Sequence, residues 1–81
     1  MLVAYEQAIE LDPNFAAAQN GKGNAFYYLK DYENALIAYE RATKIDPHFS
    51  LAYSNKGYAL KKLGRSKEAE QAFKQAQQVG E

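Results

Sequence analysis

Small and apolar residues recur every three or four positions along most of the chain. The clearest stripe lies within residues 35–45 and consists of Ala35, Leu36, Tyr39, Ala42 and Ile45. This spacing places them on one face of an α-helix, so the segment is predicted to be amphipathic and helical. Asp46-Pro47 predicts its end, because proline disfavours helical backbone in the residue before it and cannot continue the hydrogen-bond ladder.

The same pattern returns along the chain with a fixed period. Pro13 and Pro47 lie at the same place in two related phrases, IELDPNF and TKIDPHF. Lys22-Gly23 corresponds to Lys56-Gly57 with the same offset. A constant period of this size, about 34 residues, indicates stacked helical units rather than a closed globule.

The period predicts five helices in one small domain. Residues 1–15 form a half repeat that contains only a second helix, residues 16–49 form one full repeat, and residues 50–81 form another with a polar C-terminal helix. In the turn between the two helices of the second full repeat, Gly64 suits a left-handed backbone. Lys30 occupies the equivalent position in the first full repeat, where this conformation costs about 1 kcal/mol. Asp31 and Ser66 are expected to cap the helices that follow.

These residues resemble the tetratricopeptide repeat (TPR) family. The family pattern is a glycine, an aromatic or leucine residue three positions on, then A-x3-[FY]-x2-A and a closing D-P. It reads as Gly23, Phe26, Ala35, Tyr39, Ala42 and Pro47, and again as Gly57, Leu60, Ala69, Phe73 and Ala76. The family tryptophan is replaced by Gln19 and Tyr53. The resemblance implies an all-α, right-handed solenoid of antiparallel helix pairs.

Composition narrows the classes of partner. The 10 Lys and Arg residues balance 10 Asp and Glu residues, so the formal net charge is zero. This balance argues against a nucleic-acid partner and against binding to an anionic membrane. The chain has no cysteine, no membrane-spanning apolar run and no secretory signal pattern, so a cytoplasmic location is expected.

The sequence contains no recognisable catalytic, cofactor or metal site. His48 is the single histidine, and it follows Pro47 in a loop without a cluster of carboxylates. The segment GKGNA lacks the spacing of a phosphate-binding loop. Gly23 and Gly57 are better explained by close contact between helices. We therefore predict that the protein is not an enzyme.

The resemblance implies a concave face built from the first helix of each full repeat. By position, this face carries the predicted peptide-binding residues Asn20, Asn24, Tyr27, Tyr28, Asn55, Tyr58 and Lys62. Asparagine offers a donor and an acceptor to a peptide backbone, and tyrosine offers rigid contact area. The predicted function is a scaffold or adaptor that binds a protein, peptide or helix. The alternative interpretation is ordinary polar surface for the asparagines and partial burial for the tyrosines.

The N-terminal half repeat supports a second hypothesis. Its helix presents apolar residues without a preceding partner helix, and Leu2, Val3 and Ile9 are the predicted self-association residues. In this view the chain is a structural unit that forms a homo-oligomer. The competing interpretation is that the sequence is a fragment of a longer repeat array.

Overall fold

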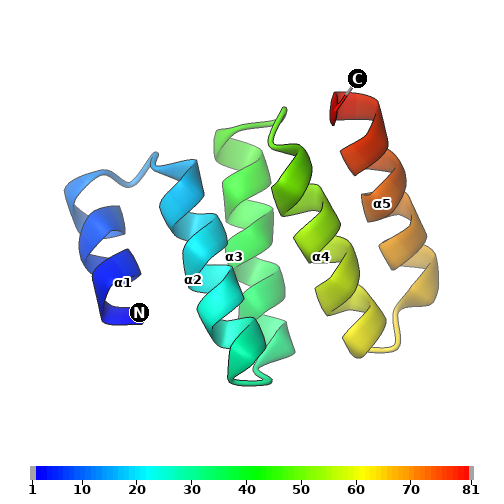
Figure 1. Ribbon diagram of the computed structural model, residues 1–81, viewed down its shortest axis with the longest axis horizontal. Coiled ribbons are helices and arrows are strands. Elements are labelled where there is room, and N and C mark those ends of the chain that lie inside the picture. Colours follow the sequence, from blue (N-terminus) through cyan, green and yellow to red (C-terminus); the bar gives the residue numbers. More distant parts are fainter. Residues whose placement is uncertain (1, 81) are drawn as a thin grey trace.

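The computed structural model describes residues 2–80 as five α-helices without a strand (Figure 1). Met1 and Glu81, at the outer ends of the predicted units, lie outside the described residues. The all-α fold predicted from the sequence is therefore confirmed. The helices are α1 (Leu2–Leu11), α2 (Ala16–Tyr28), α3 (Tyr32–Ile45), α4 (Ser50–Lys62) and α5 (Ser66–Gly80).

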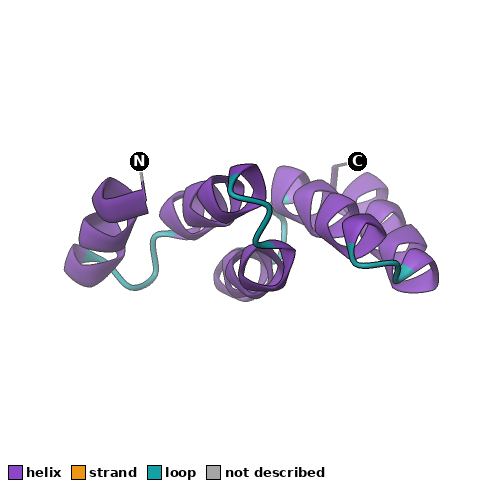
Figure 2. Ribbon diagram, turned by 90° about the horizontal axis from the view of Figure 1, so that it is seen from below, coloured by secondary structure: helices purple, strands orange, loops and turns teal. Residues whose placement is uncertain are grey.

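Each helix packs antiparallel against the next, so the helices form a row in chain order (Figure 1). Seen from the ends of the helices, α2 and α4 lie on one side of this row and α3 on the other (Figure 2). The result is a thin, two-layered body with extents of 34 × 28 × 13 Å. We call the side formed by α2 and α4 the α2/α4 face. It is the face that the family resemblance implies to be concave.

The turns inside the two full repeats share a left-handed residue. Lys30 has φ 62° and Gly64 has φ 76°, as their common slot in the repeat predicts. Asp31 caps α3 as expected, because its side chain accepts a hydrogen bond from the Asn34 backbone N–H at 3.3 Å. The expected cap by Ser66 is wrong, since Ser66 is the first residue of α5.

The position of Asp31 is taken in the second repeat by Arg65. Its guanidinium donates to both carboxylate oxygens of Glu68, at 2.9 and 2.7 Å. This contact raises the pKa of Arg65 and lowers the pKa of Glu68. Both side chains are exposed, so the pair contributes little to stability.

The core lies where α3, α4 and α5 meet, and it combines small residues with large ones. Its buried members are Ala35, Leu36, Tyr39, Ala59, Leu60, Ala69 and Ala72. Two glycines allow the closest approaches. A Cβ atom added to Gly23 would lie 2.5 Å from the Tyr39 ring, and one added to Gly57 would lie 2.6 Å from the Phe73 ring. The predicted close contact at these glycines is confirmed.

None of the helices between residues 2 and 80 combines the length and the hydrophobicity that crossing a membrane requires.

Candidate functional site

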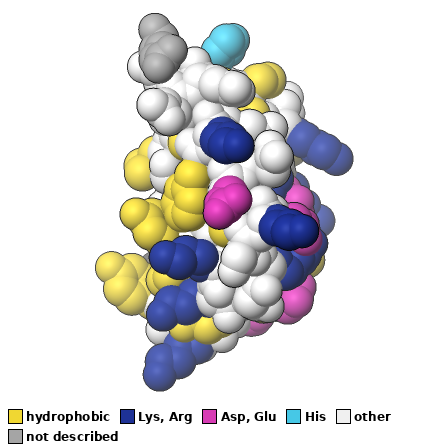
Figure 3. Space-filling view, turned by 90° about the vertical axis from the view of Figure 1, so that its right-hand side faces the viewer, with side chains coloured by type: hydrophobic (Ala, Val, Ile, Leu, Met, Phe, Trp, Pro, Cys, Tyr) yellow, Lys and Arg dark blue, Asp and Glu magenta, His cyan; other side chains and the backbone are white. Residues whose placement is uncertain are grey.

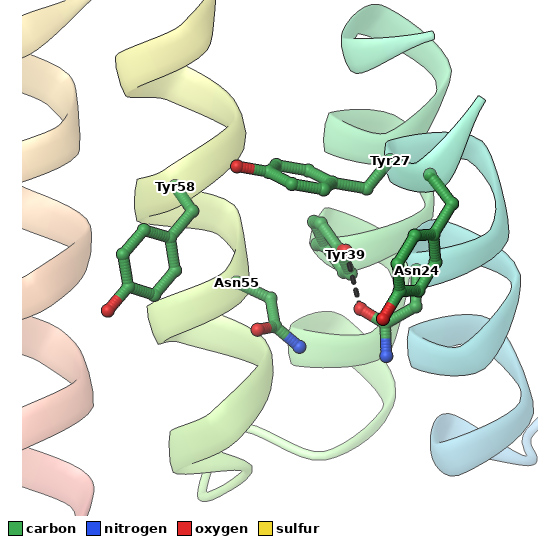
Figure 4. A pocket seen from close by; sticks show the side chains of 6 residues that line it. Asn24, Tyr27, Tyr39, Asn55 and Tyr58 are labelled. Atoms are coloured by element: carbon green, nitrogen blue, oxygen red, sulfur yellow. Dashed lines mark hydrogen bonds between the residues drawn. The ribbon is translucent and has the colours of Figure 1, made fainter. Parts of the chain in front are cut away.

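A hollow opens on the α2/α4 face between α2 and α4 (Figure 4). Its volume is about 290 Å³. Five of the seven residues that the sequence predicts for peptide binding line it, from α2 and from α4. A sixth lining residue, Tyr39, comes from α3 and forms the floor. The full lining consists of Asn24, Tyr27, Tyr28, Tyr39, Asn55 and Tyr58.

The sequence pattern assigns Tyr39 to the core stripe and misses its part in the hollow. Its side chain is only 1% exposed, and its hydroxyl donates a hydrogen bond to Asn24 Oδ1 at 2.6 Å (Figure 4). Burial, with Tyr27 and Tyr28 close by, raises the pKa of the Tyr39 phenol. The sequence did contain a signal that the Tyr39 hydroxyl has a polar partner. The next repeat has Phe73 at this position, so the hydroxyl is not needed for the core, and a buried hydroxyl requires a partner.

The two remaining predicted residues lie elsewhere. Asn20 is 6% exposed, and its Oδ1 accepts a hydrogen bond from Asn55 Nδ2 at 3.0 Å. It therefore ties α2 to α4 beneath the surface and is not open to a ligand. Lys62 is exposed at the end of α4 and does not line the hollow.

The tyrosines around the hollow differ in how firmly they are held. Tyr27 packs edge-to-face on Tyr32, with ring centroids 5.1 Å apart, and Tyr58 packs the same way on Phe73 at 5.2 Å. Tyr28 is 80% exposed and Tyr58 is 53% exposed. Large aromatic area is thus available to a partner.

Charge is distributed unevenly over the helices although the net charge is zero. α2 and α4 contain lysines and no carboxylate, whereas α1 contains two glutamates and no basic residue. The face seen in Figure 3 has hydrophobic and Lys/Arg side chains along its left-hand edge, which is the side of α2 and α4. Lys56 reaches across from α4 to Glu40 of α3 at 3.6 Å, while Lys61 and Lys62 are exposed.

The residues predicted for self-association do not share one exposed face. Leu2 and Ile9 are half-buried, whereas Val3 points outward and is 67% exposed. A second hollow, which is apolar, is formed by other residues of α1 together with the start of α2. It is lined by Ala4, Tyr5, Ala8, Phe15, Ala17 and Ala18.

No group of three or more His, Cys, Asp or Glu side chains in the described part of the chain could hold a metal ion. His48 lies in an exposed loop, where its backbone N–H donates to Asp46 Oδ1 at 3.0 Å.

Antiparallel helix pairs that repeat with a fixed period and stack in one row define a helical-repeat solenoid. The chain belongs to the tetratricopeptide repeat family. A family model described as "TPR repeat" matches residues 23–64, and one described as "Tetratricopeptide repeat" matches residues 51–79. Both the fold and the family that the sequence predicts are thus confirmed. Repeats of this family are generally non-catalytic protein-interaction modules.

Solved structures with the same arrangement are longer than this chain. A crystal structure of MamA is 30% identical with a TM-score of 0.93, and the match covers 98% of this chain and 46% of that one. The second TPR of Spaghetti (RPAP3), bound to the HSP90 peptide SRMEEVD, is 26% identical with a TM-score of 0.92 and coverages of 96% and 72%. The N-terminal domain of stress-induced protein-1 from C. elegans is 25% identical, with a TM-score of 0.88 and coverages of 95% and 66%. No curated protein sequence matches the chain.

Proposed function

We propose that this protein is a non-catalytic scaffold or adaptor that holds an extended peptide or a helix of a partner protein on its α2/α4 face. The hollow lined by asparagine and tyrosine side chains is the observation that carries this proposal. One structural neighbour, the second TPR of RPAP3, is bound to an HSP90 peptide, which supports a peptide as the class of ligand.

The shape and the chemistry of the hollow favour a peptide over a small molecule. Its volume of about 290 Å³ is at the low end for a drug-sized ligand, and it is open to solvent. Its walls are helices that pack against neighbours on both sides, so little ordering is needed on binding. Asn24 and Asn55 offer amide groups to a peptide backbone, and the tyrosine rings offer area to its side chains.

The test is an NMR titration of the 15N-labelled protein with a peptide selected from a displayed library of random twelve-residue sequences. We expect the side-chain amide resonances of Asn24 and Asn55 to shift on binding. Tyr28→Ala should weaken binding about tenfold, since it removes an exposed aromatic ring worth roughly 1–2 kcal/mol. Arg41→Ala, on an exposed position of α3, is the control and should bind as the unmodified protein does. Shifts confined to α1 or α5 would rule this site out.

Self-association through α1 is a second candidate function, and the apolar hollow beside α1 favours it. The corresponding residues one period later, Ala38 and Ala42, are fully covered, whereas Ala4 is exposed and Ala8 half-exposed. Leu11, at the end of the same helix, is 90% exposed. A second copy of the chain would cover this surface.

Light scattering over a concentration series tests self-association. If α1 pairs with α1 of a second copy, the mass should rise with protein concentration. It should also rise with salt, because salt screens the repulsion between Glu6 and Glu10 of the two copies. Leu11→Glu should then restore the monomer without loss of helix content. Ile37→Glu, at an exposed apolar position of α3, is the matched control. A constant monomer mass under all conditions would exclude this function.

A further inference from the structure

The second helices of the repeats, α1, α3 and α5, share a motif of two alanines and one aromatic residue, and only α1 leaves it open. The motif consists of Ala4, Tyr5 and Ala8 in α1, Ala38, Tyr39 and Ala42 in α3, and Ala72, Phe73 and Ala76 in α5. In α3 and α5 the alanines are buried, where the first helices α2 and α4 pack against them. In α1, Ala4 and Tyr5 are exposed and Ala8 is half-buried. Among the described helices, α1 has a neighbour on one side only (Figure 1).

This open face of α1 continues onto α2. The three motif residues of α1 line an apolar hollow of about 300 Å³ together with Phe15, Ala17 and Ala18. Phe15 is 46% exposed, whereas Phe49, its equivalent one period later, is half-buried. A partner that fills the hollow would therefore cover apolar surface of both helices at once.

The two full repeats show which kind of element covers such a face. In each of them it is an α-helix with a glycine at the point of closest approach, because a Cβ atom there would lie 2.5 Å from the Tyr39 ring or 2.6 Å from the Phe73 ring. Ser50, at the start of α4, also donates a hydrogen bond from its hydroxyl to the Ala76 carbonyl at 2.7 Å. The equivalent element on α1 is an antiparallel helix with its N-terminal end near Ala8 and a small residue opposite Tyr5.

Charge indicates the composition of this helix. The described part of α1 carries Glu6 and Glu10 and no basic residue, and Glu10 lines a further hollow with Gln7 and Leu11. The helices that cover the motif elsewhere, α2 and α4, carry lysines and no carboxylate. A helix that bears lysine is therefore complementary to α1.

A second copy of the chain offers no helix of this kind. Both first helices are already engaged, α2 with α3 and α4 with α5. The outer side of α5 is polar, because Glu70 and Gln77 stand at the positions of the buried Leu36 and Thr43 of α3. α1 of a second copy has no glycine to place opposite Tyr5, and its glutamates would add like charge.

We propose that the open face of α1 is a docking site for an amphipathic helix of a partner protein, which packs on α1 as α2 packs on α3. This helix bears lysine rather than carboxylate side chains and has glycine or another small residue opposite Tyr5. The inference goes beyond the proposed peptide site, because it concerns α1 and the start of α2 rather than the α2/α4 face. It also assigns the surface beside α1 to a helix of another protein instead of a second copy.

A first helix of the chain itself serves as the probe. A synthetic peptide with the sequence of residues 49–63, stapled between positions 58 and 62, is titrated into protein labelled with 13C at its alanine methyl groups. The staple keeps the short peptide helical, and both stapled positions are exposed in α4. We expect the methyl resonances of Ala4 and Ala8 to shift. The affinity should fall as salt is added, since the peptide is basic and α1 is acidic.

Matched variants of the protein and of the peptide locate the contact. Ala8→Glu in the protein should weaken binding by about tenfold or more, because it places a charge in the apolar hollow. Ile37→Glu, at an exposed position of α3, is the control and should leave binding unchanged. Gly57→Leu in the peptide should weaken binding by about tenfold through overpacking against α1. If Ala8→Glu lowers the helix content, the peptide variant alone decides, because it leaves the protein unmodified.

Several results would overturn the docking site. They are the absence of binding by the stapled peptide, shifts confined to the α2/α4 face, and equal affinity of the Gly57→Leu peptide. A protein whose mass doubles with concentration, and whose dimer the peptide does not dissociate, would assign the surface to a second copy. Salt separates the two occupants, because it should weaken docking of the basic helix and strengthen pairing of α1 with α1.

Discussion

Gly23→Ala is expected to lower the free energy of unfolding by about 2 kcal/mol, although alanine favours a helix over glycine by about 1 kcal/mol. The new Cβ atom would lie 2.5 Å from the ring of Tyr39. That ring is fully buried and is tethered to Asn24 by its hydroxyl, so it cannot turn aside. Chemical denaturation monitored by circular dichroism would measure the loss.

Gly57 in α4 and Gly21 in α2 provide graded controls. Gly57→Ala brings the new Cβ atom to 2.6 Å from Phe73, but Phe73 is only partly buried and has no hydroxyl to hold it. Gly21→Ala meets the Tyr5 ring of α1, which is exposed at its outer side and can move away. We expect the destabilisation to fall in the order Gly23, Gly57, Gly21. Equal effects at all three positions would show that ring burial does not decide the cost.

Asn24→Ala is expected to cost more than Tyr39→Phe, although both variants remove the same hydrogen bond. Without Asn24, the Tyr39 hydroxyl is buried with no acceptor, at a cost of about 1–3 kcal/mol. Without the hydroxyl, Asn24 is only partly buried and can turn to water, so we expect a loss of at most about 1 kcal/mol. The double variant should be nearly as stable as Tyr39→Phe alone. A double-mutant cycle with strictly additive losses would contradict this.

The same tyrosine makes stability depend on alkaline pH. The unfolded phenol ionises near pH 10, whereas burial keeps Tyr39 protonated above that value in the folded protein. The stability that comes from its raised pKa is fully present below pH 10 and is lost as the pH rises further. The expected slope is about 1.4 kcal/mol per pH unit, and Tyr39→Phe should abolish it. Urea denaturation between pH 9 and pH 11 measures this slope.

Much of the fold follows from local sequence signals. The fixed period, the prolines after Asp12 and Asp46, and the small residues at equivalent positions were enough to predict five helices and their order. The left-handed backbone at Lys30 was predicted because its repeat partner is Gly64. The cap of α5 was mispredicted because serine is a common capping residue, although the repeat register assigns that position to Arg65.

The candidate site could be predicted only where a side chain points directly out of its own helix. The resemblance to the repeat family placed Asn24, Tyr27 and Tyr58 on one face, and the hollow brings them together. It could not show that Asn20 is covered, because its burial depends on the hydrogen bond from Asn55 of the neighbouring repeat. It also could not show that Tyr39 reaches the hollow from α3, since that depends on the space left by Gly23.

The lysines of α4 and the glutamates of α1 give this molecule of zero net charge an electric dipole along the row of helices. Its positive pole lies at the exposed Lys61 and Lys62, beside Tyr58. Any acidic molecule that approaches is turned by this field before contact is made, and it meets the aromatic side of the hollow first. Physiological salt confines the effect to the last few ångströms of the approach, about 8 Å. The encounter is therefore oriented only at the end, when the approaching molecule is already over the α2/α4 face.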